Sequence, residues 1–300
     1  MRIDEHLAAG SEPSFSFEFF PPRTDEGERN LGRALAELAR LEPTFVSVTY
    51  GAGGTTDQKR KTVDIVRSIK AQHGLEAMAH FTCVGATVGE LRATLDLMRD
   101  AGIENVLALR GDPPPGETEW TATEGGLSYS RELIDMIRSD YDFAIGAACF
   151  PEVHIHAESP ESDLRYLKEK VDAGARFLIT QLFFDNAAYW DFVARAREVG
   201  VDVPIVPGIM PITNFEQIKR FTDMCGATIP HPLLRELGLR ADQPGAVADF
   251  GVAYATLQCA DLLAKGAPGI HFYTLNKSPA TRAILSALRA LAPWRDAVPA

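Results

Sequence analysis

Apolar and polar residues alternate along this chain with two periods, one of two residues and one near 3.6. Eight short runs rich in Val, Ile, Phe, Ala and Leu fit β-strands, and each is followed by a segment with the helical period. The predicted strands span residues 14–20, 45–50, 76–83, 105–110, 143–150, 177–184, 204–210 and 269–276. The predicted helices span 28–41, 57–72, 89–101, 130–139, 163–173, 187–199, 215–225 and 279–291, with an extra helical region near 232–265.

This alternation predicts an α/β fold with a parallel sheet. Eight strand–helix units joined by right-handed crossovers close most economically into a (β/α)8 TIM barrel, here with extra helices before the last strand. An open doubly wound sheet would need a dinucleotide fingerprint after the first strand, where Pro21-Pro22-Arg23 stands instead. No linker or composition shift divides the chain, so we expect residues 1–300 to form a single barrel domain.

Composition and charge limit the classes of partner that this chain is expected to bind. The chain is 46% hydrophobic and 24% charged, and its formal net charge is −11. That charge argues against nucleic acid as the main partner, although a small anionic ligand needs only a few local cations. The four cysteines lie far apart without a Cys-x-x-Cys pair, which favours buried thiols in a reducing compartment. The chain has no run of eighteen apolar residues and no apolar leader segment, so we expect a cytoplasmic protein without membrane contact.

Glu18 is the least expected residue of the first predicted strand. It stands in the aromatic run Phe15-Ser-Phe-Glu-Phe-Phe20, where strand alternation puts it on one face with Ser16. A carboxylate on a buried face costs free energy unless a partner or a proton compensates for it. Glu18 is therefore either a solvated acid on an edge strand or a general acid held inside a pocket.

Polar residues recur at the ends of the other predicted strands, where a barrel gathers its functional side chains. Thr49, His80, the Arg110–Asp112 string, His154, Gln181 and Lys277 all occupy such positions. Gly146 and Ala148 share a strand face with Phe150 and would leave room for a flat ligand if that face lines the lumen. Each residue alone has a structural alternative, such as a core histidine for His80. Their joint placement favours a site at one end of the barrel.

Two further motifs have simpler explanations. The glycine-rich turn Gly51-Ala-Gly-Gly-Thr-Thr56 lacks the third glycine of a dinucleotide fingerprint and indicates a tight turn after a strand. The His154-Ile-His156 pair has no carboxylate or cysteine at ligand spacing, so we expect no metal site.

Motifs along nearly the whole chain resemble the single-domain bacterial type of methylenetetrahydrofolate reductase. The matching strings are Ser16-Phe-Glu-Phe-Phe-Pro-Pro-Arg23, Val46-Ser-Val-Thr-Tyr-Gly-Ala52, Ala79-His80, Leu109-Arg-Gly-Asp112, Pro151-Glu-Val-His154, Lys170-Val-Asp-Ala-Gly174, Ile179-Thr-Gln181, Pro207-Gly-Ile209 and His271-Phe-Tyr-Thr-Leu-Asn276. The resemblance implies a flavoprotein oxidoreductase that uses FAD and NADH or NADPH. Its reaction would reduce 5,10-methylenetetrahydrofolate to 5-methyltetrahydrofolate by ping-pong hydride transfer, feeding methionine synthesis.

The resemblance also assigns roles to individual residues. Glu18 would be the general acid that protonates N10, and Asp112 would be the carboxylate that stabilises the iminium on N5. Cofactor-binding positions would be Thr49, Tyr50, Ala52, His80, Arg110, Gly111, Asp112, Tyr129, Ser130, Phe150, His154, Ala157, Asp163, Tyr166 and Lys170. Substrate or nicotinamide would contact Asp112, Gln181, Gln217, Phe221 and Lys277.

Three positions depart from the family pattern. Phe150 stands where relatives often have Tyr, Glu169 where many carry a cation, and Tyr166 replaces a smaller polar residue, all of which bear on the affinity for FAD. Relatives are often oligomers, but the sequence leaves the oligomeric state open, as it does the choice between NADH and NADPH. Two alternatives remain: a flavin-free, pterin-binding methyltransferase barrel and a non-catalytic protein that binds flavin or folate.

Overall fold

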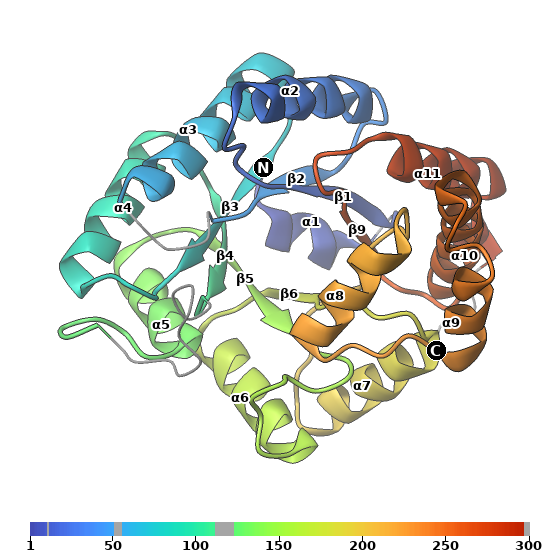
Figure 1. Cartoon of the computed structure of the whole chain (residues 1–300). Coiled ribbons are helices and arrows are strands. Elements are labelled where there is room, and N and C mark those ends of the chain that lie inside the picture. Colours follow the sequence, from blue (N-terminus) through green and yellow to red (C-terminus); the bar gives the residue numbers. More distant parts are fainter. Residues whose placement is uncertain (11, 51–55, 112–122, 297–300) are drawn as a thin grey trace.

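The computed structural model, which describes residues 1–10, 12–50, 56–111 and 123–296, is a ring of parallel strands surrounded by helices (Figure 1). The strands are β1 (Ser14–Phe19), β2 (Phe45–Val48), β3 (Ala77–Thr82), β4 (Asn105–Leu109), β5 (Ala144–Cys149), β6 (Phe177–Thr180), β7 (Ile205–Val206), β8 (Gly208–Ile209) and β9 (Gly269–Tyr273). The helices are α1 (Ile3–Ala9), α2 (Asp25–Ala39), α3 (Thr56–His73), α4 (Val88–Asp100), α5 (Ser130–Asp140), α6 (Pro160–Ala173), α7 (Asn186–Glu198), α8 (Phe215–Cys225), α9 (His231–Gly238), α10 (Pro244–Ala264) and α11 (Pro279–Leu291), followed by a 3-10 turn, η1 (Pro293–Asp296).

The ring closes through a strand that is split in two. The strand order is β7-β6-β5-β4-β3-β2-β1-β9-β8, and Pro207 separates β7 from β8. Because β7 pairs with β6 while β8 pairs with β9, the two short pieces act as the seventh strand of an eight-stranded barrel. The predicted (β/α)8 architecture is confirmed, including helices α8, α9 and α10 between this strand and β9.

Side chains that cap the helix ends explain where several helices begin. Thr24, Thr87, Ser159 and Asn214 each precede a helix and accept a hydrogen bond from a backbone N–H of its first turn. At Thr87 the carboxylate of Glu90 also accepts from the Thr87 N–H, completing a capping box. These starts lie after the strand ends, so the intervening loops gather at one end of the barrel.

Strand alternation separates two hydrophobic layers. Alternate residues such as Phe17, Val46, Ala79 and Val106 face the surrounding helices and belong to the large outer core. The other set faces the lumen and forms a smaller core of Phe45, Met78, Leu107, Phe177, Ile179 and Val206. The same registers bring Ser16, Glu18, His80, His271 and Tyr273 to the lumen face.

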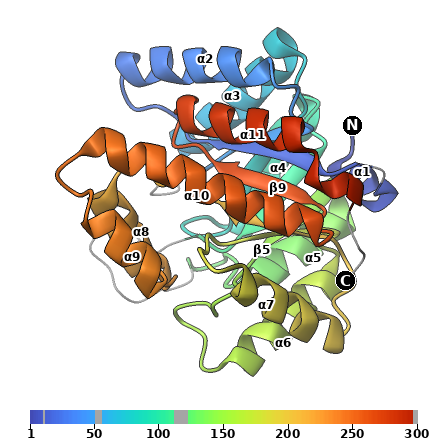
Figure 2. The same cartoon turned by 90° about the vertical axis from the view of Figure 1, so that its right-hand side faces the viewer.

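Helix α1 covers one end of the barrel, opposite the end where the loops between strands and following helices gather (Figure 2). Its Ile3 and Leu7 are buried and join the lumen core. Asn105, at the start of β4, accepts a hydrogen bond from the Ile3 N–H (2.8 Å) and donates to the Met1 carbonyl (2.9 Å). The sequence patterns did not predict α1, because a seven-residue helix with two buried positions has almost no periodicity to detect.

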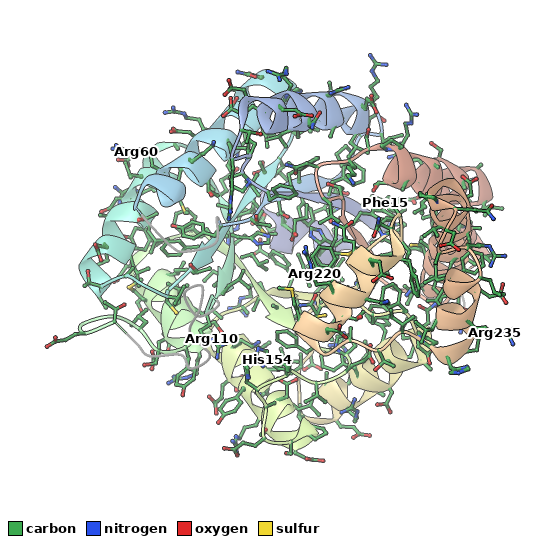
Figure 3. All side chains as sticks on the ribbon, viewed as in Figure 1. Phe15, Arg60, Arg110, His154, Arg220 and Arg235 are labelled. Atoms are coloured by element: carbon green, nitrogen blue, oxygen red, sulfur yellow. The ribbon has the colours of Figure 1, made fainter. Side chains whose placement is uncertain are left out.

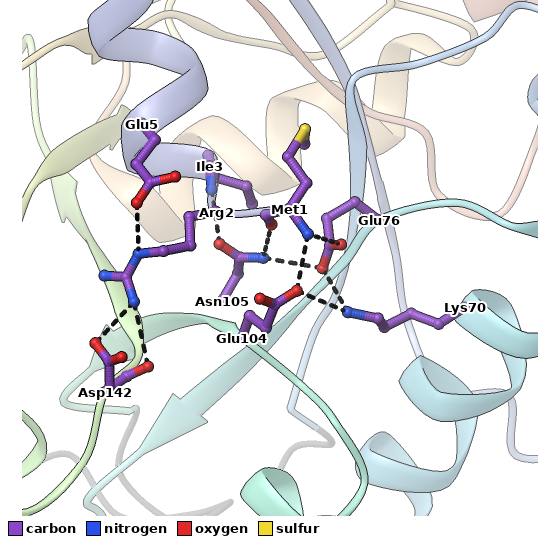
Figure 4. A network of polar contacts seen from close by, with 9 residues as sticks. All are labelled: Met1, Arg2, Ile3, Glu5, Lys70, Glu76, Glu104, Asn105 and Asp142. Atoms are coloured by element: carbon purple, nitrogen blue, oxygen red, sulfur yellow. Dashed lines mark hydrogen bonds and ion pairs between the residues drawn. The ribbon is translucent and has the colours of Figure 1, made fainter.

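Polar contacts fasten α1 to the barrel (Figure 4). The Met1 amino group pairs with Glu76 (2.9 Å) and Glu104 (2.8 Å), and Arg2 pairs with Asp142 (2.9 Å). Glu76 also receives the Lys70 ammonium at 2.8 Å. The end of the barrel that α1 covers is therefore closed by apolar packing, with ion pairs around it.

Helices α8 and α9 lie at the opposite end (Figures 1 and 2). They pack on a third hydrophobic cluster, separate from both layers of the barrel, which contains Leu182, Phe184, Met210, Ile212, Ile218, Leu233, Leu237 and Val247. Gly251 of α10 lies so close to the Ile212 carbonyl that a Cβ there would stand 1.8 Å from the oxygen. The two helices thus lie beside the end of the barrel where the strands end and their loops gather, here called the mouth.

Candidate active site

Glu18 lies on the lumen face of β1 with its carboxylate between two histidines. The distance from Glu18 Oε2 to Nε2 is 3.4 Å for His80 on β3 and 3.6 Å for His271 on β9. Both imidazoles are buried, with side-chain exposures of 7% and 0%, whereas Glu18 is 20% exposed. The predicted inward carboxyl of Glu18 is confirmed, and the alternative of a solvated edge residue is wrong.

The two histidines differ in how they are held. The His271 Nδ1 atom is 2.8 Å from the Ser16 hydroxyl, which fixes the ring from the side away from Glu18. The Nε2 atoms of both rings approach Glu18 without the geometry of a hydrogen bond. Burial lowers the pKa of His80 to about 4, with the opposing effect of Glu18 second in size and a further lowering by His271. His80 is therefore neutral at pH 7.

Around β5 and α6, five of the predicted cofactor residues come together. The Phe150 and His154 rings meet edge to face at 4.5 Å, and Asp163 accepts a hydrogen bond from the His154 N–H at 3.2 Å. The Lys170 ammonium donates to the Ala148 carbonyl at 2.6 Å and lies 5.9 Å from the Phe150 ring. The Ala157 N–H in turn donates to the His154 carbonyl at 2.8 Å.

Burial perturbs both charged groups of this cluster. It lowers the pKa of Lys170, opposed by Cys149 and Asp163, and it raises the pKa of Asp163, opposed by the His154 N–H and by Lys170. A half-buried ammonium next to a half-buried carboxylate is the kind of arrangement that an anionic ligand would complete.

Gly146 and Ala148 of β5 face the lumen, as predicted from alternation. The space at Gly146 is taken, however, because a Cβ there would lie 2.5 Å from the Phe177 ring and 3.0 Å from Leu107. The expectation that Gly146 leaves room for a ligand is therefore wrong, and its hydrogen side chain serves packing. Ala148 is half-buried near the mouth and keeps its space.

Several cofactor-binding predictions fall at the ends of β2 and β4. Thr49 is half-buried, and its N–H donates to the Phe19 carbonyl at 2.8 Å. The Tyr50 ring packs edge to face on Phe81 at 5.8 Å, in the outer layer, and burial raises the pKa of its hydroxyl. The Arg110 Nε–H donates to the Gly111 carbonyl at 3.2 Å.

Gly111 has a left-handed φ of 95°, and a Cβ there would lie 2.3 Å from Val84, so this position requires glycine. Asp112, the predicted second catalytic carboxyl, and Ala52 lie outside the described residues. Figure 3 shows Arg110 and His154 at the mouth together with Arg220 of α8.

The predicted substrate residues lie on the other side of the mouth. Gln217 and Phe221, on α8, line a small pocket whose wall also includes Leu275, two residues after the end of β9. Lys277 follows two residues later and is exposed. Gln181 is half-buried after β6, and its side-chain oxygen accepts from the Leu182 N–H at 2.9 Å.

Three predicted cofactor residues lie further out, at the start of α5 and in the second turn of α6. Tyr129 is 60% exposed and Tyr166 is 47% exposed, with the Arg165 guanidinium 4.9 Å from the centre of the Tyr166 ring. Ser130 begins α5. Glu169 is one of the three departures from the family pattern, an acid where many relatives carry a cation. It pairs with Arg131 of α5 at 3.6 Å, so a cation is still present next to this position.

Sequence reasoning did not single out three residues that share the lumen face with Glu18: Ser16, His271 and Tyr273. The signal was present, because His271 and Tyr273 share a face of the last predicted strand. In a closed barrel that strand pairs with the first, and the observed register sets Ser16 opposite His271 and Glu18 opposite Tyr273.

Other site classes find little support in the described part of the chain. All four cysteines are free thiols, and Cys83, Cys149 and Cys259 are buried. In the same part, no three His, Cys, Asp or Glu side chains gather as a metal site would require. Nor does any described helix combine the length and apolarity needed to cross a membrane.

Known proteins resemble this chain over most of its length. The family described as methylenetetrahydrofolate reductase matches residues 2–289. The 5,10-methylenetetrahydrofolate reductase of Escherichia coli K12 is 41% identical over 273 residues, which cover 91% of this chain and 90% of that protein. Methylenetetrahydrofolate reductase (NADH) 1 of Arabidopsis thaliana is 40% identical over 95% of this chain but 51% of the relative, so the chain spans about half the length of the plant relatives.

A structural comparison supports the fold independently. An uncharacterised protein from Clostridium thermocellum, which binds two copies of 5-methyl-5,6,7,8-tetrahydrofolic acid, superposes with a TM-score of 0.64 at 16% identity, over 96% of this chain and 98% of that one. At that identity the likeness concerns the fold alone. The family match and the extent of the identity to the bacterial enzyme establish that this chain belongs to the methylenetetrahydrofolate reductase family.

Proposed function

We propose that this protein reduces 5,10-methylenetetrahydrofolate to 5-methyltetrahydrofolate with electrons from NADH or NADPH, using FAD as its cofactor. The observation that carries the proposal is the carboxyl of Glu18, held between His80 and His271 at the mouth of a barrel of this family. The 41% identity to the Escherichia coli enzyme supports the same reaction. The free thiols suit a reducing compartment, so we place the reaction in the cytoplasm.

The residues around β5 and α6 fit FAD, which carries two phosphates and a flat ring system. Lys170 offers a cation with a depressed pKa, Arg110 and His154 add donors at the mouth, and the small side chain of Ala148 leaves room there. Arg131, paired with Glu169, offers a further cation on the outer side. When bound, FAD supplies the hydride relay between nicotinamide and folate.

Glu18 would donate the proton that opening of the folate five-membered ring requires at N10. Its neighbours suit a proton donor. His80 is neutral because burial lowers its pKa, and it therefore places no fixed positive charge beside the carboxyl. His271, anchored by Ser16, limits the side-chain positions that Glu18 can adopt. Asp112 would stabilise the cationic iminium on N5, a role that rests on the family resemblance.

The opposite side of the mouth would bind the substrate. Gln217 and Phe221 lie beside Leu275 and would contact the pterin or the nicotinamide in turn, with Gln181 after β6. Lys277 is exposed two residues after Leu275 and would attract the carboxylates of folate. A chain of net charge −11 that gathers cations at its mouth favours anionic small ligands there.

The decisive experiment follows the two half-reactions separately. Purified protein should carry or take up FAD, be reduced by NADH or NADPH without folate, and then be reoxidised by 5,10-methylenetetrahydrofolate. Glu18→Gln should keep flavin reduction and lower the folate half-reaction by a factor of roughly 10² to 10⁴. Glu26→Gln, which changes an exposed glutamate on α2, is the matched control and should leave both rates unchanged.

Other outcomes would select the alternatives. A protein that binds folate but neither contains nor accepts FAD would point to a pterin-binding methyltransferase barrel. Binding of flavin and folate with no turnover, and no effect of Glu18→Gln, would indicate a non-catalytic binding protein.

A further inference from the structure

The last strand holds the end of β1 with side chains after its backbone pairing stops. The ladder between β1 and β9 runs from Ser14–Gly269 to Glu18–Tyr273. Just beyond it, the Thr274 hydroxyl donates to the backbone carbonyl of Glu18 at 2.6 Å. Thr274 is 5% exposed, so this hydroxyl is committed to a contact inside the protein.

Asn276 makes the next contacts between the end of β1 and the segment after β9, a junction here called the seam. Its side-chain oxygen accepts from the Phe20 N–H at 3.0 Å, and its amide nitrogen donates to the Phe20 carbonyl at 2.9 Å. The carboxamide therefore imitates a backbone peptide group and satisfies both polar groups of Phe20. Asn276 is itself 7% exposed.

The backbone takes an unusual path to reach this geometry. Leu275 and Asn276 have φ values of 52° and 56°, a left-handed conformation that costs free energy in residues other than glycine. Asparagine tolerates it better than most residues, and leucine does not. The turn brings the Asn276 side chain against the end of β1 and leaves the following residue, Lys277, exposed.

We propose that Thr274 and Asn276 are positioning residues for Glu18, an inference that rests on the proposed function. Glu18 is the next-to-last residue of β1, and the chain after it turns at Pro21-Pro22, which cannot donate ladder hydrogen bonds. The two side chains prevent this strand end from fraying. They keep the carboxyl within contact distance of His80 and His271, where a displacement of about 1 Å can cost up to roughly a hundredfold in rate.

The test uses variants that separate the side chains from the backbone. Asn276→Gly removes both hydrogen bonds to Phe20 while glycine accepts the left-handed φ without strain. Thr274→Val removes the hydroxyl at nearly constant shape, and Thr274→Ser restores it as the matched control. For each full-length flavin-loaded variant, stopped-flow absorbance measures flavin reduction by NADH and reoxidation by 5,10-methylenetetrahydrofolate, with thermal unfolding recorded alongside.

We expect Asn276→Gly and Thr274→Val to lower the maximal folate half-reaction about tenfold or more, with flavin reduction within about twofold of wild type. Thr274→Ser should recover the wild-type ratio of the two rates. Equal losses in both half-reactions, or no loss in either, would show that the seam is only structural and overturn the inference. A wild-type protein that reduces its flavin but never folate would overturn the proposed function, and this inference with it.

Discussion

At the scale of single residues, the candidate site combines an acid, Glu18, with a neighbouring histidine, His80, that carries no fixed positive charge. Glu18 has two histidine neighbours, yet His80 stays neutral because burying an imidazolium costs more than the nearby carboxylate returns. Ser16 fixes the other ring, His271, by a single contact of 2.8 Å. The charge next to Glu18 is thus a matter of burial as much as of residue type.

The depressed pKa of His80 makes stability depend on pH. In the unfolded chain the imidazole binds a proton below about pH 6.5, whereas in the folded protein it does so only near pH 4. Between these values the unfolded state binds more protons, so the free energy of unfolding should fall as the pH drops, by up to roughly 3 kcal/mol in total. Urea unfolding at pH 7.5 and pH 5.0 measures this loss.

His80→Gln should flatten that dependence, because its side chain does not titrate. His231→Gln, at an exposed histidine at the start of α9, should keep the wild-type slope. If the free energy of unfolding changed equally with pH in His80→Gln and in the wild type, His80 would not be the buried neutral imidazole that causes the dependence.

The sequence located the acid and one of its two histidine neighbours, His80, but not the other. An acid in an aromatic strand is visible as a local exception, so Glu18 could be singled out. His271 and Tyr273 look like ordinary strand residues, and their meaning depends on a register between the first and last strands, 255 residues apart from Ser16 to His271. The barrel prediction implies that the first and last strands pair, but a local pattern does not show which side chains then stand opposite each other.

At the scale of elements, α8 is attached to the mouth at both ends. Its Gln217 and Phe221 share a pocket with Leu275, while the segment after its C-terminus meets the loop after β5. There the Thr228 N–H donates to the Glu152 carboxylate at 3.0 Å, and Gly226 lies against Ile155. The loop that carries Phe150 and His154 therefore also holds one end of α8.

Removing the Glu152 acceptor should loosen this attachment. We expect Glu152→Ala to speed hydrogen exchange at the Thr228 amide about fivefold, the equivalent of losing one hydrogen bond of about 1 kcal/mol. Glu152→Gln keeps an acceptor oxygen, and Thr228→Ala keeps the N–H, so both should exchange as the wild type does. Exchange resolved by mass spectrometry over residues 226–230 is the measurement, and unchanged protection in Glu152→Ala would contradict the attachment.

Element boundaries were predicted well where periodicity was strong and poorly where it was absent. Every predicted strand is present, although the run at 177–184 ends at Thr180, because the apolar residues beyond it belong to the cluster under α8 and α9. The helical region 232–265 divides into α9 and α10, since Pro244 starts a new helix. Apolar composition alone does not tell which core a segment joins.

At the scale of the whole molecule, the two ends of the barrel have separate tasks. The mouth carries the polar site, and the opposite end is sealed by α1, whose Ile3 and Leu7 fill the lumen beneath Phe45 and Met78. Changes to the contacts between α1 and the barrel should lower the free energy of unfolding and should leave the chemistry at the mouth intact.

Asn105 is the residue to change. It is fully buried and makes three hydrogen bonds, to the Ile3 N–H, the Met1 carbonyl and Glu76. Asn105→Ala leaves these groups without partners and should lower the free energy of unfolding by about 2–4 kcal/mol, measured by chemical denaturation. Asp142→Asn, at a side chain that is 99% exposed in its ion pair with Arg2, is the control and should cost less than about 1 kcal/mol.

The rate of flavin reduction by NADH at 25 °C should be unchanged in Asn105→Ala, because the mouth does not depend on α1. A loss of that rate comparable to the loss of stability would show that the two ends are coupled.

Pro207 interrupts the strand ring of this barrel at one place. It divides the seventh strand into two pieces of two residues each, β7 and β8, which bind different neighbours, and it has no N–H with which to join the ladder. Every other strand is longer and unbroken. When the folded protein opens locally, the ring should therefore part first at this divided strand.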